Sequence, residues 1–413
     1  MKMSAPSTVD TTYTPPAAAG SESASPRNGR IVSLDIVRGA VMILMAIDHV
    51  RVYAGVPAGG PSPGVFFTRW ITHFCAPAFI FLAGTAAFLH GQKLSSKREL
   101  SIFLLTRGLW LVLLELTVLR FAWTFNFDYA NFTFAGVIWA IGCCMILMAG
   151  LVHLPVGVIA ALGFLLVGAH NIVGSMTPAL MPRIEGSSLE WLWRLLYFGG
   201  MFQLSDGGPT VAVLYSIVPW IGVMALGYAF GTVMRLPMEE RRRVTLSLGI
   251  AAVIAFLVLR GFNLYGDPRP WPAQQNVPAP IAFLNTAKYP ASLLFLLMTL
   301  GPTLIAVALL EGARGRVARW IAVFGRVPFF YYVLHIPLIH LVAVLISLVR
   351  TPESTGWLVG NHPFLPPDVP EGYRYSLPLL YAVFALVVVA LYFPSRWFAE
   401  LKAKRKEWWL SYL

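Results

Sequence analysis

The stretch Leu377-Pro-Leu-Leu-Tyr-Ala-Val-Phe-Ala-Leu-Val-Val-Val-Ala-Leu-Tyr-Phe-Pro-Ser395 contains no charged residue over 19 consecutive positions. An α-helix rises about 1.5 Å per residue, so about 20 apolar residues are enough to cross the hydrocarbon core of a bilayer. Nine further apolar runs of comparable length occur at 31–54, 70–90, 100–121, 134–150, 154–172, 211–234, 244–262, 290–311 and 328–348. The sequence therefore predicts an all-α fold, a polytopic integral membrane protein built as a bundle of about ten transmembrane helices.

The composition supports this prediction and excludes a soluble enzyme. Of the 413 residues, 57% are hydrophobic and only 12% are charged, whereas soluble domains carry about 25% charged residues. A membrane β-barrel is also excluded, because its strands alternate apolar and polar residues over about ten positions, and the runs here are longer and nearly unbroken.

Basic residues indicate how the chain crosses the bilayer. The formal net charge is +12, yet Lys and Arg recur at the ends of apolar runs instead of gathering on one domain, so we expect no nucleic-acid partner. Alternate connections hold Arg27 and Arg30; Lys93, Lys97 and Arg98; Arg235, Arg241, Arg242 and Arg243; Arg314, Arg316 and Arg319; and Lys402, Lys404, Arg405 and Lys406. The opposite connections hold only scattered bases, and the positive-inside rule therefore places both termini in the cytoplasm.

We expect three parts along the chain. Residues 1–28 are rich in Ser, Thr, Pro and Ala and lack the apolar segment of a signal peptide, which predicts a disordered cytoplasmic tail. Residues 29–398 are expected to form the transmembrane domain, and residues 399–413 a basic cytoplasmic tail.

The connections predicted on the outer side are long and aromatic. Residues 173–210, 263–289 and 349–376 are rich in Trp, Pro, Gly and Tyr, so we expect them to cover a cavity. Within them, residues 190–204 predict either a short interfacial helix or an ordinary aromatic anchor at the headgroup level.

The first apolar run carries ionisable side chains, which are costly inside a bilayer and mark a candidate functional site. Within Ser33-Leu-Asp-Ile-Val-Arg-Gly-Ala-Val-Met-Ile-Leu-Met-Ala-Ile-Asp-His49, Asp35 and Arg38 are one helical turn apart, and His49 follows eleven residues after Arg38. Eleven steps end about 20° from the starting direction and about 16 Å along the axis, so Arg38 and His49 share one face. This face predicts the lining of a passage; the alternative is an Asp35–Arg38 pair near the headgroups and a hydrogen-bonded, structural His49.

Further ionisable residues lie in or near other runs. His73 is predicted at a depth similar to that of His49, either facing the same cavity or as a hydrogen-bonded structural histidine. Lys288 lies at the predicted outer mouth, where it can meet an anionic ligand or serve only a structural role. His335 and His340 are five residues apart, about 140° around a helix, so we do not expect them to share a metal ion. No other His or Cys spacing predicts a metal site.

The segments between the runs contain no Walker loop, Rossmann glycine pattern or nucleophile elbow. We therefore expect chemistry or transport within the bilayer. Two classes remain open: a membrane enzyme, and a proton-coupled secondary transporter or exporter in which Asp35, Asp48 and the histidines form a proton relay.

A resemblance to a known family rests on five stretches. They are Arg30-Ile-Val-Ser-Leu-Asp-Ile-Val-Arg-Gly-Ala-Val-Met-Ile-Leu-Met45, Phe79-Ile-Phe-Leu-Ala-Gly84, Gly136-Val-Ile-Trp-Ala-Ile-Gly142, Val218-Pro-Trp-Ile-Gly-Val-Met224 and Gly325-Arg-Val-Pro-Phe-Phe-Tyr-Tyr-Val-Leu-His335. They resemble motifs of the heparan-alpha-glucosaminide N-acetyltransferase catalytic domain family. The interval from Arg38 to His49 is also similar to an Arg and His pair in the wider group of membrane acyltransferases that modify surface sugars.

The resemblance implies an enzyme that moves an acetyl or other acyl group from cytoplasmic acyl-CoA to a hydroxyl or amine of a sugar acceptor on the far side of the membrane. Acetyl-CoA, or another acyl-CoA, is then the donor substrate, and no metal ion is expected. We expect a multi-pass protein of the bacterial cytoplasmic membrane, with the lipid bilayer and a glycan acceptor as partners. Whether the chain forms a homodimer is left open.

Candidate roles follow from the physical and the family interpretation together. We expect His49 to act as the general base, with Asp48 beside it and His73 as the competing catalytic candidate. The planar guanidinium of Arg38 suits a phosphate. An extended pantetheine arm can bridge the separation of about 16 Å between Arg38 and His49. The candidate donor-binding residues are Asp35, Arg38, Arg326 and His335, and the candidate acceptor-binding residues are Lys288 and Arg51.

Overall fold

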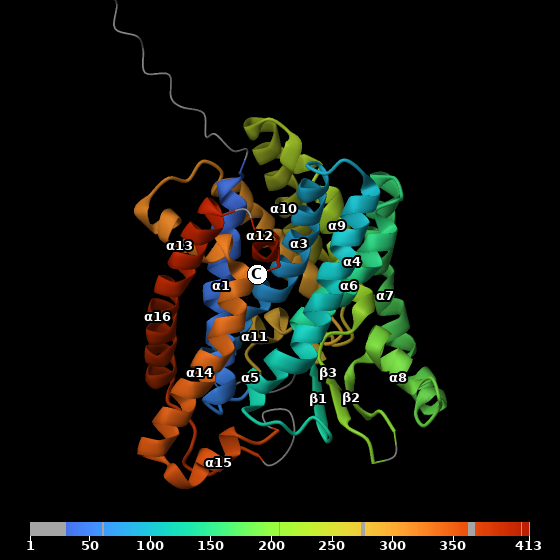
Figure 1. Cartoon of the computed structure of the whole chain (residues 1–413). Helices are drawn as coiled ribbons and strands as arrows, with labels where there is room; N and C mark the ends of the chain where they lie inside the picture. The colour runs from blue at the N-terminus through green and yellow to red at the C-terminus, as the bar shows by residue number, and fades with distance from the viewer. Residues whose placement is uncertain are drawn as a thin grey trace, which may run out of the picture. The chain divides into compact units, whose positions relative to one another are not determined.

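Each predicted apolar run coincides with a helix in the computed structural model, which describes residues 30–59, 62–205, 207–273, 277–361, 368–405 and 407–412. The helices are α1 (Val32–Tyr53), α3 (Cys75–Gly91), α4 (Lys97–Leu114), α6 (Val137–Leu151), α7 (Val156–Ile184), α9 (Ile217–Phe230), α10 (Met238–Gly261), α12 (Leu293–Leu309), α14 (Pro328–Arg350) and α16 (Leu377–Lys404). Figure 1 shows most of them running side by side within the unit Val32–Leu413. The predicted helical bundle is confirmed, while the predicted tail at 1–28 lies outside the described residues.

Seven helical stretches among the described residues are long and apolar enough to cross a membrane. They are Pro63–Gly91, Lys97–Thr124, Val156–Thr177, Ile217–Arg235, Met238–Gly261, Pro328–Arg350 and Leu377–Lys404. α6 and α12 are apolar but shorter, with 15 and 17 residues, and α1 has 22 residues but carries several charges. The chain is a multi-pass membrane protein, whereas ten crossings and cytoplasmic termini stay predictions.

Serine side chains fix where several helices begin. Ser96, Ser292 and Ser376 directly precede α4, α12 and α16, and each hydroxyl accepts a hydrogen bond from the backbone N–H three residues later. The first N–H groups of a helix have no partner within it, so a serine at this position satisfies one of them and favours the start of the helix there.

Glycines bring several pairs of helices into backbone contact. α1 packs on α13 (Arg316–Arg326), a helix outside the predicted runs. A Cβ atom at Gly39 would lie 2.0 Å from the carbonyl oxygen of Ile321, and one at Gly325 would lie 1.8 Å from that of Asp35. Similar glycine contacts join α3 to α9 (Gly84 and Gly227), α4 to α6 (Gly108 and Gly142) and α10 to α12 (Gly249 and Gly301). Small residues at crossings are typical of membrane helices, because they allow close van der Waals packing.

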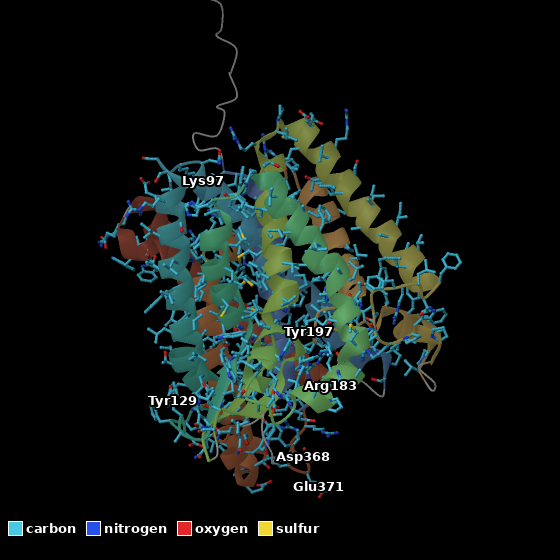
Figure 2. All side chains as sticks on the ribbon, turned by 90° about the vertical axis from the view of Figure 1, so that its right-hand side faces the viewer. Lys97, Tyr129, Arg183, Tyr197, Asp368 and Glu371 are labelled. Carbon is cyan, nitrogen blue, oxygen red and sulfur yellow. The ribbon has the colours of Figure 1, made fainter. Side chains whose placement is uncertain are left out.

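Connections that the sequence assigns to opposite sides of the membrane lie at opposite ends of the bundle. Figure 2 shows Lys97 at one end, and Tyr129, Arg183, Asp368 and Glu371 at the other. We call the end with Lys97 the inner end and the other the outer end.

A three-stranded sheet at the outer end differs from the expected all-helical connections (Figure 1). β1 (Phe132–Ala135) pairs in parallel with β3 (Thr210–Val213), which pairs antiparallel with β2 (Gly200–Gln203). The apolar run predicted to begin at 211 therefore starts as a strand, and α9 begins only at Ile217. Outside the bundle the backbone groups of a connection need hydrogen-bond partners, and three short strands provide them for one another.

Other connections are more helical than expected. α7 continues to Ile184, and α8 (Glu190–Trp193) runs into a π-helical turn over Arg194–Phe198. The helix predicted over 190–204 ends there, because Gly199 and Gly200 adopt φ angles of 66° and 86° that favour glycine. The remaining short helices are α2 (Pro63–Trp70), α5 (Arg120–Thr124), α11 (Ala279–Leu284) and α15 (Thr355–Leu358).

The last helix extends past the predicted start of the C-terminal tail. α16 continues without a break through residue 398 to Lys404, so the boundary predicted at 399 falls inside a helix. Beyond it, Leu410 is buried against Val327 and Phe398. Part of the predicted tail therefore packs on the helical unit.

Candidate active site

His49 of α1 lies directly against His335 of α14. Nδ1 of His49 is 2.6 Å from Nε2 of His335, and the two ring centroids are 4.8 Å apart. His335 is fully buried, whereas His49 is half-buried. His335 therefore contacts the candidate base, and its expected role in donor binding stays a prediction.

The surroundings of His335 assign the protons of this pair. Nδ1 of His335 lies 2.6 Å from the backbone carbonyl oxygen of Tyr332, which can only accept, so Nδ1 carries a proton. Neutral His335 then has its lone pair on Nε2, and Nδ1 of His49 must donate a hydrogen bond to it. Neutral His49 consequently has its own lone pair on Nε2, where it can accept a proton.

Aromatic side chains hold the His49 ring from two directions. The edge contact with Trp123 has a centroid distance of 4.8 Å, and that with Tyr332 has one of 6.3 Å. The segment of Trp123 is itself fixed to α1, because the Tyr53 hydroxyl donates a 2.7 Å hydrogen bond to the Trp123 carbonyl. These contacts restrict rotation of the imidazole and favour a single orientation for the base.

Asp48 forms an ion pair next to the histidines. Its Oδ1 atom accepts a 2.9 Å hydrogen bond from Nε of Arg51, whose Nη1 donates to the carbonyl oxygen of Val56 at 2.7 Å. Arg69 and Lys288 also act on Asp48 electrostatically. Asp48 therefore balances several positive charges, and Arg51, which we expected to bind the acceptor, is engaged by this pair.

Asp267 positions the segment that carries Lys288. The Oδ2 atom of Asp267 accepts hydrogen bonds from the Ala287 backbone N–H at 2.7 Å and from the Ser292 hydroxyl at 2.8 Å. Arg260, which is 1% exposed, lies with Nη1 3.8 Å from Oδ1 of the same carboxylate. Asp267 thus holds the chain both before and after Lys288.

The ammonium group of Lys288 is sheltered by two tyrosines. Its Nζ atom lies 5.9 Å from the ring centroid of Tyr215 and 5.3 Å from that of Tyr289, within the range of cation–π attraction. Burial, and secondarily the neighbouring Tyr289, raises the pKa of the Tyr215 phenol well above its ordinary value. Tyr215 therefore stays protonated beside the cation.

The side chain of His73 is buried and has no hydrogen-bond partner among the described residues. It is 4% exposed, and neither ring nitrogen has a partner among the described residues. Its ring meets Phe295 edge-on at a centroid distance of 5.4 Å. We expected hydrogen bonds if this histidine were structural, and leaving a buried polar group unsatisfied costs about 1–3 kcal/mol. His73 and His49 both interact electrostatically with Asp48 and Lys288, so the two histidines border the same charged groups.

Arg38 and Asp35 form a second polar group toward the inner end of α1. Nη1 of Arg38 lies 3.7 Å from Oδ1 of Asp35 and donates a 3.2 Å hydrogen bond to the carbonyl oxygen of Gly325. Because α1 is one continuous helix, the rise from Arg38 to His49 is about 16 Å. The predicted arrangement, with a charged pair and a histidine on one helix, is therefore present.

Arg326 is exposed and directly follows Gly325, whose carbonyl oxygen accepts the hydrogen bond from Arg38. It lines a groove between α13 and α16, and Arg38 is not among the residues that line that groove. The role predicted for Arg326 in donor binding stays a prediction.

The described residues contain no group of three or more His, Cys, Asp or Glu side chains placed to hold a metal ion. His340 is oriented elsewhere: its ring nitrogens lie 3.0 and 2.8 Å from the carbonyl oxygens of Ala122 and Leu358. A site without a metal ion stays a prediction.

Sequence reasoning missed several residues that build this site. Asp267 could have been found, because it is the only acidic residue in the connection 263–289. Trp123 and Tyr332 give no such signal, because the chain contains 13 Trp and 15 Tyr residues.

The fold and the site together describe a bundle of membrane helices with a pair of histidines beside a cluster of charged groups. The family described as Heparan-alpha-glucosaminide N-acetyltransferase, catalytic, matches residues 30–264, more than half of the chain. The chain belongs to this family and is a membrane acetyltransferase. No curated protein matches the chain. The matched region contains His49 and His73, whereas Lys288 and His335 lie beyond it.

Proposed function

We propose that the protein transfers an acetyl or other acyl group from cytoplasmic acyl-CoA to a hydroxyl or amine of a sugar acceptor on the extracytoplasmic side of a bacterial cytoplasmic membrane. The observation that carries this proposal is the His49–His335 pair, whose hydrogen bonds leave the lone pair of His49 on Nε2. A general base needs such an accessible lone pair within reach of the acceptor.

The reaction is direct transfer. The acceptor oxygen or nitrogen loses its proton to Nε2 of His49 while it attacks the thioester carbonyl carbon. The tetrahedral intermediate then collapses, the carbon–sulfur bond breaks, and the leaving CoA sulfur takes a proton, so the products are the acylated acceptor and free CoA. His335 supports the positive charge that forms on His49, because Nδ1–H of His49 still donates to Nε2 of His335.

The donor enters from the inner end. Arg38, oriented by Asp35 and the Gly325 carbonyl, contacts a phosphate or the polar part of the pantetheine arm. The thioester then reaches His49 at about 16 Å along α1, a distance that the extended arm can span.

The acceptor enters from the outer end, where Lys288 and the Asp48–Arg51 pair lie. Lys288 attracts an anionic or polar acceptor, and Asp48 balances the local positive charge. The family description names a glucosaminide, which supports an amino sugar as the acceptor. His73 is the second candidate base, since its ring nitrogens have no partner among the described residues.

The test uses full-length protein purified in detergent with acetyl-CoA and a set of amino sugars and hydroxyl sugars. We expect release of CoA thiol that depends on the sugar, and an acetylated product detectable by mass spectrometry. A transporter that uses Asp35, Asp48 and the histidines as a proton relay would instead give pH-driven solute flux in vesicles without consuming acetyl-CoA.

A further inference from the structure

A basic groove of about 760 Å³ lies between α13 and α16, which pack side by side at the inner end (Figure 1). Its lining includes Arg316, Arg319, Arg326 and Arg396 and a single carboxylate, Glu400. The three arginines of α13 fall at spacings of three and seven residues, so they lie along one face of that helix. Four positive charges and one negative charge give this α13–α16 groove a net charge of +3.

Most of that positive charge has no counter-charge among the described residues. Arg396 is paired with Glu400 at 3.0 Å, and Arg319 donates a hydrogen bond to the carbonyl oxygen of Arg314 at 3.0 Å. The side chains of Arg316 and Arg326 make no hydrogen bond or ion pair with any described residue. Guanidinium groups gathered around one groove favour a phosphate, which can accept several charge-assisted hydrogen bonds at once.

The rest of the groove is apolar and includes two aromatic side chains. Trp320 of α13 and Tyr392 of α16 stack at a centroid distance of 5.6 Å, and both line the groove. Trp and Tyr are enriched where a membrane protein meets the headgroup region. The groove thus combines cations with the aromatic residues typical of that depth.

An exposed apolar stripe adjoins the groove on α16. Leu386, Val389, Phe393 and Trp397 are all more than half exposed, at 59%, 55%, 66% and 59%. Their spacing of three and four residues puts them on one helix face, and Phe393 and Trp397 directly follow the groove residues Tyr392 and Arg396. A ligand with an anionic head and long apolar tails matches both the basic groove and the adjoining apolar stripe. A free phosphate matches only the groove.

The acyl-CoA donor fits the groove less well. The backbones of α1 and α13 touch at Gly39 and Gly325, which leaves no room at this crossing for a pantetheine arm to pass from α13 toward His49. A nucleotide in the groove would also leave the apolar stripe on α16 uncovered.

We propose that the α13–α16 groove binds the phosphate headgroup of an anionic phospholipid, whose acyl chains lie along the exposed face of α16. Basic pockets between membrane helices bind anionic lipid headgroups in this way. Arg326 then belongs to this lipid site and not to the donor site.

Native mass spectrometry of the full chain in detergent tests this site. The protein is titrated with phosphatidylglycerol and, separately, with phosphatidylcholine of the same acyl chains. We expect the wild type to bind phosphatidylglycerol more tightly, and the double variant Arg316→Gln/Arg319→Gln to bind it about 30-fold more weakly. The matched control is Arg242→Gln/Arg243→Gln, which removes two exposed charges from the start of α10 and should keep wild-type affinity.

Several results would overturn the proposal. Equal affinity of the wild type for the two lipids is one, and it needs no variant to be folded. The proposal also fails if the groove variant binds phosphatidylglycerol as tightly as the wild type, or if the α10 control loses as much affinity as the groove variant. Displacement of phosphatidylglycerol by inorganic phosphate alone would make the groove a free-anion site, and displacement by acetyl-CoA, with weaker acetyl-CoA binding in the groove variant, would make it a nucleotide site.

Discussion

Nδ1 of His49 lies 2.6 Å from Nε2 of His335, although 286 residues separate the two histidines in the chain. The contact joins the first predicted membrane run to the ninth, and it places a residue beyond the family match at the centre of the proposed site. Because Nδ1 of His335 is committed to the Tyr332 carbonyl, the pair has a defined direction of hydrogen bonding. This direction supports the proposal that His49 is the base and His335 its positioning partner.

Replacing His335 tests that division of roles. His335→Leu removes the acceptor for Nδ1–H of His49, so kcat should fall by roughly 10-fold to 10²-fold with a smaller change in KM. His335→Gln should restore part of the rate, because its side-chain carbonyl can accept the same hydrogen bond. Steady-state kinetics on both variants measure this, and wild-type kcat in His335→Leu would show that the contact has no part in turnover.

The buried His73 ring, whose nitrogens lack described hydrogen-bond partners, predicts that an apolar replacement does not destabilise the protein. His73→Leu removes a buried polar group that has no partner among the described residues, so the melting temperature in detergent should stay the same or rise. His170 offers a matched control, because its Nε2 lies 2.8 Å from the Ala291 carbonyl oxygen and its Nδ1 2.9 Å from that of Leu166. His170→Leu should therefore lower the melting temperature. A marked loss of stability in His73→Leu alone would mean that His73 is a structural residue after all.

Arg38 should contribute to donor binding. Arg38→Ala is expected to weaken acyl-CoA binding by about 10-fold to 10²-fold, the range for losing one charge-assisted hydrogen bond, while the helix remains intact. Lysine should restore only part of the affinity, because it lacks the planar guanidinium. Isothermal titration with acetyl-CoA measures the effect, with exposed Arg98→Ala as the control at the same end of the bundle. If Arg38→Ala binds acetyl-CoA as tightly as the wild type, Arg38 has no part in donor binding and only pairs with Asp35.

The contact between α1 and α13 predicts a strong steric effect. An alanine Cβ at Gly325 would lie 1.8 Å from the Asp35 carbonyl oxygen, so Gly325→Ala must separate the two helices. We expect a loss of about 1–3 kcal/mol or more, visible as a lower melting temperature. Gly157→Ala in α7 is the matched control, because nothing lies within 4 Å of its added Cβ. Equal melting temperatures for the two variants would contradict the close crossing.

The helices could be predicted from the sequence because each depends on a local property, a long apolar run such as 377–395. The polar pattern of α1 was equally local, so Asp35, Arg38 and His49 were predicted on a single helix. The roles of these residues, acyl-CoA binding by Asp35 and Arg38 and base catalysis by His49, stay predictions.

The rest of the site depends on tertiary contacts that no local pattern encodes. His335 could not be matched to His49, because which helix faces α1 is decided by packing, including the glycine crossings. The small sheet was missed for a similar reason, since β1 pairs with β3 although Phe132 and its partner Thr210 are 78 positions apart in the chain. The groove that Arg326 lines could not be predicted either, because it forms where α13 packs against α16.

Single-turnover acetyl transfer by His49→Gln and His73→Gln, measured on purified protein with bound acetyl-CoA, tests the central claim most directly. Glutamine keeps hydrogen-bonding capacity but cannot act as a base near neutral pH, so the rate of His49→Gln should fall by about 10² to 10⁴ with acetyl-CoA affinity nearly unchanged. His73→Gln should lose less. A near-normal rate in His49→Gln together with an inactive His73→Gln would contradict the assignment and make His73 the base.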